Sequence, residues 1–124
     1  MKLKSRGIDP QVVSLCDARI DAAVAIQFKD AMRAIQSPTA GRVILDLSAV
    51  DFVDSSGLGA IVAAKKSMAP GQQLDLAGLS PMVERVFRLT RMDTIFDLYL
   101  TLAEAEAAGA DRPGVSLSVG KPGS

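Results

Sequence analysis

Residues 43–66 read VILDLSAVDFVDSSGLGAIVAAKK, the most informative local pattern in the chain. The aliphatic, β-branched run at 43–47 predicts a buried strand. A short loop follows, and the apolar spacing after it predicts a helix that begins at the pair Ser55-Ser56. This pair places two hydroxyls at a helix N-terminus, where backbone N–H groups and the helix dipole favour a phosphate. A phosphate at such a position can switch a binding surface on or off.

The rest of the chain alternates between strand and helix patterns. Two predicted strands, at residues 2–6 and 11–16, flank a Gly-Ile-Asp-Pro turn, which indicates a hairpin. The elements predicted after this hairpin, besides those in residues 43–66, are a helix at 22–36 capped by Asp21, a strand at 74–77, a helix from Ser80-Pro81, a strand at 95–100 and a helix from the capping box Thr101-x-x-Glu104 to about residue 108. Because strands and helices alternate, we expect an α/β fold: a single domain with a mixed, mostly parallel central sheet and helices packed against it.

Composition excludes several kinds of site. The 124 residues carry 14 basic and 14 acidic side chains, so the formal charge is zero and nothing indicates binding to nucleic acid. There is no histidine, which excludes a Ser-His-Asp triad and any histidine-containing zinc site within this chain. The single cysteine, Cys16, excludes an intrachain disulfide. We expect a protein that is not an enzyme, with no catalytic residue, no metal and no cofactor.

The composition changes at the C-terminal end. Residues 109–124 are rich in Gly, Pro and Ser, which is typical of a flexible tail, so the predicted folded domain spans residues 1–108. The basic N-terminus has no apolar region behind it and does not resemble a signal peptide. The longest apolar run, at 58–64, is far shorter than the ~18 residues needed to span a bilayer. We expect a cytoplasmic protein that does not act at a membrane.

Several alternatives fit parts of the segment Asp54-Ser55-Ser56-Gly57-Leu58-Gly59. A dinucleotide site requires G-x-G-x-x-G, and Gly57 and Gly59 supply only the first two glycines. A P-loop requires a glycine before its lysine, which the Lys-Lys-Ser triplet at 65–67 lacks. A hydrolase nucleophile elbow would need a glycine in place of Val53 and a histidine base. In a purely structural alternative, one of the serines is an N-cap worth about 1 kcal/mol, and the glycines ease a tight turn into the helix.

The longer run Ile44-Leu-Asp-Leu-Ser-x-Val-x-Phe-x-Asp-Ser-Ser-Gly-Leu-Gly-Ala60 resembles the signature of STAS domains, and specifically of bacterial anti-sigma factor antagonists. Segments at 19–25, 76–79 and 86–96 are similar to further segments of that family, in the same order. The resemblance covers the whole predicted folded domain. One departure is Ala18, where the family usually has a glycine before the arginine of a Gly-Arg-x-Asp motif.

The resemblance implies a regulatory switch that works by binding a partner protein. A serine kinase that is itself an anti-sigma factor would phosphorylate Ser56, the second serine of the turn. The unphosphorylated protein would bind this anti-sigma factor and free a sigma factor, and the phosphorylated protein would release it. A serine phosphatase would reset the switch. The partner-binding residues that the resemblance implies are Asp21, Asp54, Ser55, Ser56, Gly57, Leu58 and Gly59.

Other functions remain open at the level of sequence. A STAS domain can also be a scaffold in a stress-signalling complex or an accessory subunit of a lipid-transport complex. A protein of another class would bind a nucleotide with Gly57 and Gly59. Under the switch hypothesis, a phosphate on Ser56 would lie beside Asp51 and Asp54, with no arginine nearby in the sequence. We also expect the two glycines to let a partner approach the turn closely.

Overall fold

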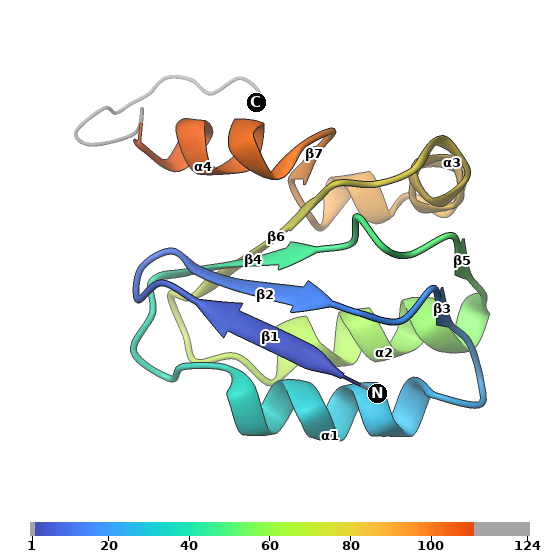
Figure 1. Ribbon diagram of the computed structural model, residues 1–124, viewed down its shortest axis with the longest axis horizontal. Coiled ribbons are helices and arrows are strands. Elements are labelled where there is room, and N and C mark those ends of the chain that lie inside the picture. The colour runs from blue at the N-terminus through green and yellow to red at the C-terminus, as the bar shows by residue number, and fades with distance from the viewer. Residues whose placement is uncertain (1, 111–124) are drawn as a thin grey trace.

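The structure, a computed structural model, describes residues 2–110 (Figure 1). Its strands are β1 (Leu3–Arg6), β2 (Gln11–Leu15), β3 (Arg19–Ile20), β4 (Arg42–Asp46), β5 (Phe52–Val53), β6 (Gln73–Ala77) and β7 (Leu98–Tyr99). Its helices are α1 (Ala25–Ile35), α2 (Ser55–Lys66), α3 (Pro81–Leu89), the short 3-10 helix η1 (Met92–Thr94) and α4 (Leu102–Ala110). Of the tail predicted at 109–124, residues 109 and 110 end α4, and the others lie outside the described residues.

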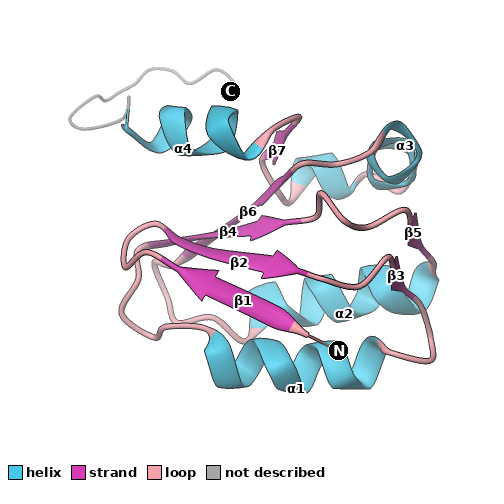
Figure 2. Cartoon of the chain, viewed as in Figure 1, coloured by secondary structure: helices cyan, strands magenta, loops and turns pink. Residues whose placement is uncertain are grey.

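The main sheet has the strand order β1-β2-β4-β6-β7. β1 runs antiparallel to β2, and the other neighbouring strands run parallel. From β2 to β4 to β6 the chain always moves to the next strand in the same direction, and right-handed crossovers then place their connecting helices on one side. Figure 2 shows α1 and α2 together on one side of the sheet and α4 on the other. The α/β prediction with a mixed, mostly parallel sheet is confirmed.

Strand register divides the interior into a large and a small core. Val13, Leu45 and Leu76 are neighbours across β2, β4 and β6 and belong to the large core. Phe28 of α1 and Ile61 of α2 cover them, and all five side chains are 0% exposed. Because successive strand residues point to opposite faces, the residues between them face α4 instead. There Val12, Ile44 and Ala77 form the small core with Ala105 of α4.

The face toward α4 also buries an ion pair. Nε of Arg42 donates to Oδ2 of Asp75 at 2.6 Å, and the guanidinium lies 5.7 Å from the centroid of the Tyr99 ring. Burial raises the pKa of Asp75, against the opposing effects of a hydrogen bond from Gln73 and the charge of Arg42. Nη1 and Nη2 of Arg42 are buried without a hydrogen-bond partner within the described part of the chain. Two hydrogen-bond donors of the ion pair are therefore unsatisfied within these residues.

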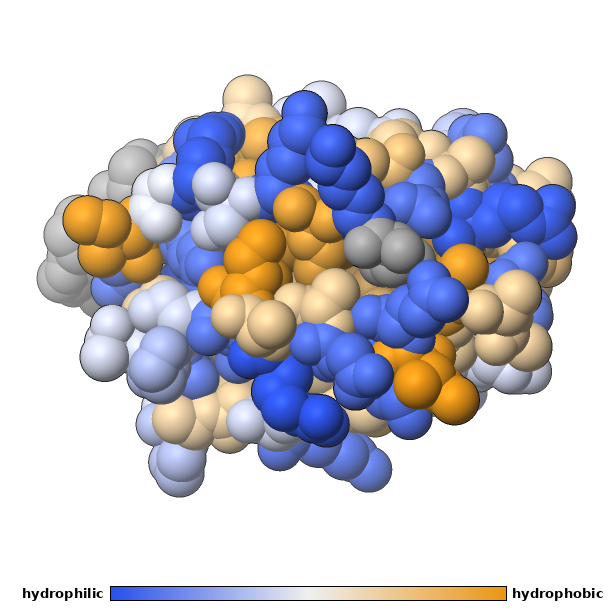
Figure 3. Space-filling model, turned by 60° about the horizontal axis from the view of Figure 1, so that its bottom comes forward, coloured by the Kyte–Doolittle hydropathy of each residue, from blue (hydrophilic) through white to orange (hydrophobic). Residues whose placement is uncertain are grey.

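The outer surface of α1 and α2 is mixed in character. Figure 3, which brings this side forward, shows hydrophobic side chains near the middle of the view and in smaller areas around it, bordered by hydrophilic ones. On α1, Ile26 is 68% exposed while Phe28 is fully buried, as expected for a helix with one face on the core.

Local differences from the sequence prediction have clear causes. The helix predicted at 22–36 begins only at Ala25, because residues 21–24 form a turn closed by the bond from Val24 N to Asp21 O at 3.1 Å. The strand predicted at 95–100 is reduced to β7, because Ile95 is the C-cap of η1 and residues 96 and 97 follow it as a bend and an irregular segment. The pair β3 and β5 was not predicted at all.

Removing one partner of the buried pair tests its energetic role. Asp75→Ala leaves the Arg42 charge buried and uncompensated, so we expect the free energy of unfolding to fall by about 3–5 kcal/mol. The double variant Arg42→Met with Asp75→Leu removes both charges and should lie within about 1 kcal/mol of the wild type, or be more stable. Urea unfolding of the three proteins measures this. A double variant that is less stable than Asp75→Ala would contradict it.

Candidate functional site

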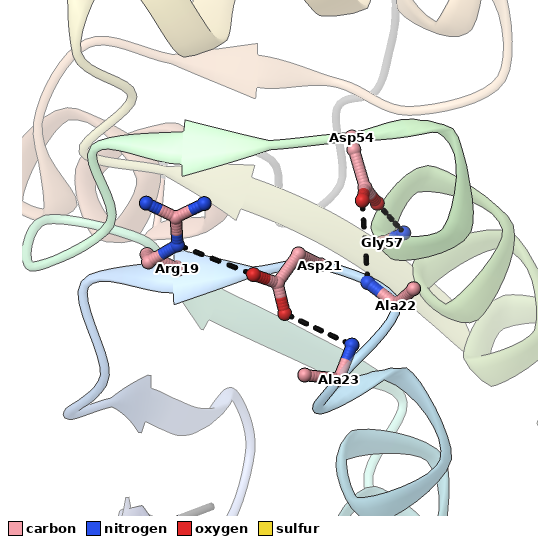
Figure 4. A network of polar contacts seen from close by, with 6 residues as sticks. All are labelled: Arg19, Asp21, Ala22, Ala23, Asp54 and Gly57. Carbon is pink, nitrogen blue, oxygen red and sulfur yellow. Dashed lines mark hydrogen bonds and ion pairs between the residues drawn. The ribbon is translucent and has the colours of Figure 1, made fainter.

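Asp54 is the N-cap of α2 (Figure 4). Its backbone is extended, with φ −99° and ψ −174°, and its Oδ1 accepts a hydrogen bond from Gly57 N at 2.9 Å. The predicted start of this helix at Ser55-Ser56 is confirmed, whereas the structural alternative in which one of the serines is the N-cap is wrong, because the acid one residue earlier fills that position. The two serines form the first residues of the helix proper, and both are exposed. Their hydroxyls are therefore not needed to start the helix.

The same carboxylate joins α2 to the turn before α1. Oδ2 of Asp54 accepts a hydrogen bond from Ala22 N at 3.2 Å. Within that turn, Oδ1 of Asp21 accepts from Ala23 N at 3.1 Å and its Oδ2 accepts from Arg19 Nε at 3.2 Å. Figure 4 shows these groups as one network. Asp21 and Asp54, far apart in the sequence, thus stabilise neighbouring turns at the same end of the sheet.

Gly57 is buried and packs against the chain itself. A Cβ atom on this residue would lie 2.0 Å from the carbonyl oxygen of Ile20 in β3. No side chain fits at that distance, so glycine is required for α2 to approach β3. The close approach expected at Gly57 is made by Ile20 and not by a partner.

Gly59 has the opposite surroundings. It is exposed, and a Cβ atom there would meet nothing within 4 Å. Between the two glycines, Leu58 is half-buried and packs against the large core. Of the predicted partner-binding residues, Ser55, Ser56 and Gly59 are exposed, whereas Gly57 is buried against β3.

The protein-family model described as STAS domain matches residues 3–105. The chain belongs to the STAS domain family. An anti-sigma-B factor antagonist from Listeria monocytogenes is 32% identical over 99 residues, which are 79% of this chain and 86% of that protein. The crystal structure of an anti-sigma factor antagonist from Mycobacterium paratuberculosis has a TM-score of 0.76 and 29% identity, covering 86% of this chain and 92% of that one. A sulfate transporter family protein from Wolinella succinogenes shares the fold, with a TM-score of 0.67 and 19% identity over 80% and 83% of the two chains.

In this STAS domain the pairing of β3 with β5 assembles the site, and the sequence prediction missed it. Arg19 pairs with Phe52 and Ile20 with Val53, in parallel. The arginine carbon Cζ lies 4.7 Å from the centroid of the Phe52 ring. Neither residue was predicted to belong to the site. The sequence pattern that could have predicted these strands was weak, because each strand has only two residues.

The geometry of the turn bears on which ligands it can take. The N–H of Gly57, which a nucleotide phosphate would use in a glycine-rich loop, already donates to Asp54, and that carboxylate would repel a phosphate. Among the described residues, no group of three or more His, Cys, Asp or Glu side chains could hold a metal ion. In the same part of the chain, no helix is long and apolar enough to cross a membrane. The chemistry available at this turn is that of serine hydroxyls and carboxylates.

The two glycines of α2 give a matched test of the packing argument. Gly57→Ala should destabilise the STAS domain by about 1–3 kcal/mol or more, because the new methyl group overlaps Ile20 and forces α2 outward. Gly59→Ala should stabilise it by up to about 1 kcal/mol, since the site is open and alanine favours the helix. Thermal and urea unfolding measure both effects. Equal stability of the two variants would contradict the assigned role of Gly57.

Proposed function

We propose that this STAS domain is an anti-sigma factor antagonist controlled by phosphorylation of Ser56. In its unphosphorylated form it binds an anti-sigma factor that is a serine kinase, which frees a sigma factor for transcription. Phosphorylation of Ser56 by that kinase releases the complex, and a serine phosphatase restores the binding form. The observation that carries the proposal is the exposed pair Ser55-Ser56 in the first turn of α2, directly after an aspartate that already caps the helix. The names of the relatives from Listeria and Mycobacterium support the general role.

The cap explains how a serine here can be modified without loss of the fold. Because Asp54 accepts the hydrogen bond that caps α2, the helix does not need the Ser56 hydroxyl as its N-cap. Phosphorylation adds about 1.5–2 negative charges at neutral pH. At the helix N-terminus the dipole favours this charge and offsets part of its repulsion from Asp54, while toward a partner the charge adds to Asp51 and Asp54. The modification thus changes the outer surface and leaves the core in place.

The proposed binding surface is small and polar. It comprises the residues predicted from the sequence, namely Asp21, Asp54, Ser55, Ser56, Leu58 and Gly59, with Gly57 behind them. Transient interfaces resemble the rest of a protein surface in polarity and derive their specificity from shape and charge. A negatively charged group placed in such a surface repels an acidic partner patch, which is sufficient for release. The protein acts in the cytoplasm by binding, without catalysing a reaction and without a cofactor.

Affinity capture from the native host tests the switch. Wild type and Ser56→Ala should both retain a kinase-like anti-sigma factor, and Ser56→Glu should lose it because the added charge repels the partner. Ser55→Ala and Ser55→Glu serve as matched controls for the neighbouring hydroxyl. Mass spectrometry identifies the retained proteins. Capture of transporter or scaffold subunits that does not depend on residue 56 would overturn the antagonist proposal and support the scaffold or lipid-transport alternative.

Gly59 tests whether the partner approaches the first turns of α2. Gly59→Val should weaken binding of the captured anti-sigma factor by tenfold or more, because a branched side chain fills the open space above the helix. The variant should remain folded, since valine is a better helix former than glycine. Binding is measured by titration calorimetry, with circular dichroism to confirm folding. Unchanged affinity in the folded variant would place the partner elsewhere.

A further inference from the structure

We propose that Arg19 is the cation that holds a phosphoryl group on Ser56. The inference rests on the proposed function, since it requires Ser56 to carry the phosphate. The sequence alone gives no arginine next to the phosphorylation turn. The short parallel pair of β3 and β5 supplies one from a distant segment.

The register of β3 and β5 sets the distance between Arg19 and Ser56. Arg19 lies opposite Phe52, and the Asp54 N–H donates to Ile20 O at 3.3 Å, so the two segments stay side by side up to the start of α2. Asp54 is two residues beyond Phe52, or about 7 Å along an extended strand, and Ser56 follows in the first turn of the helix. The long arginine side chain already reaches Asp21, and Figure 4 shows Arg19 and Asp54 at the same end of the domain, on either side of Asp21.

The contacts of Arg19 hold it in place without burying it. Its side chain is 63% exposed, stacks over Phe52 and pairs with Asp21 through Nε. Because the ion pair uses Nε, the two terminal nitrogens of the guanidinium can approach a second anion. Planar guanidinium groups bind phosphate oxygens in a bidentate manner more readily than lysine does.

The charge balance of the two segments favours this pairing. In residues 17–24, which precede α1, and 51–58, which end in the first turn of α2, Arg19 is the only basic residue, whereas the acids are Asp17, Asp21, Asp51 and Asp54. The helix α3, which packs against β5, carries Glu84, Arg85 and Arg88. A phosphate on Ser56 would otherwise face only carboxylates from these segments. An opposite charge within a few Å favours the doubly ionised phosphate and lowers its second pKa. Arg19 thus makes the phosphorylated state compatible with its acidic surroundings.

The experiment uses the full chain with phosphoserine incorporated at position 56 by genetic encoding, so that no kinase is required. The 31P chemical shift is followed from pH 4 to pH 8 in the wild type and in Arg19→Gln, Arg19→Lys and Arg85→Gln variants. The second ionisation of free phosphoserine lies near pH 6. We expect the wild-type midpoint to be lower than that of Arg19→Gln by about half a pH unit, less than for a buried pair because the site is exposed. Arg19→Lys should restore part of the difference.

Arg85 is the matched control because it lies on α3, the helix that packs against β5. The Arg85→Gln midpoint should equal that of the wild type. Equal midpoints for wild type and Arg19→Gln, or a shift in Arg85→Gln alone, would overturn the assignment to Arg19. Neither result would affect the proposed binding of an anti-sigma factor, which the capture experiment tests with the unmodified protein. Circular dichroism of each variant confirms that the fold is intact.

Discussion

The two hydrogen bonds accepted by the Asp54 carboxylate are the interaction on which the site depends. One oxygen caps α2 at Gly57, and the other fixes the turn before α1 at Ala22. A single side chain therefore positions the N-termini of two helices that follow different strands. Neither Ser55 nor Ser56 is therefore needed to cap the helix. A change to either hydroxyl can alter the surface of the first turn of α2 while the fold of the domain stays the same.

Much of the fold follows from local sequence patterns. The strand at 43–47, the strand at 74–77 and the helix capped by Ser80 were all predicted from periodicity and capping signals, and the structure has them with small shifts. These elements are long enough for a pattern to repeat. Their order along the chain was sufficient to predict a mostly parallel sheet, because parallel neighbours require helical crossovers.

The candidate site was harder to predict because its parts come together through tertiary contacts. The pairing of Arg19 with Phe52 joins segments separated by more than thirty residues through strands of two residues each, too short for any alternation to appear. The cap was misassigned because aspartate and serine are nearly equal as N-caps, and only the extended backbone at Asp54 distinguishes them. Gly57 and Gly59 look alike in the sequence, yet one touches a carbonyl oxygen and the other faces open space.

The direction of α4 has a consequence for how this domain can be joined to other sequences. α4 returns along the far side of the sheet, tied to β1 by an ion pair of 3.0 Å between Glu106 and Arg6, and leads the chain away from the end that carries Ser56 (Figure 1). A module fused directly to Ala110 would therefore begin at the opposite end of the molecule from Ser56. A fusion made directly at the end of α4 therefore suits covalent joining and surface immobilisation, because it leaves the exposed Ser55-Ser56 turn accessible to macromolecules.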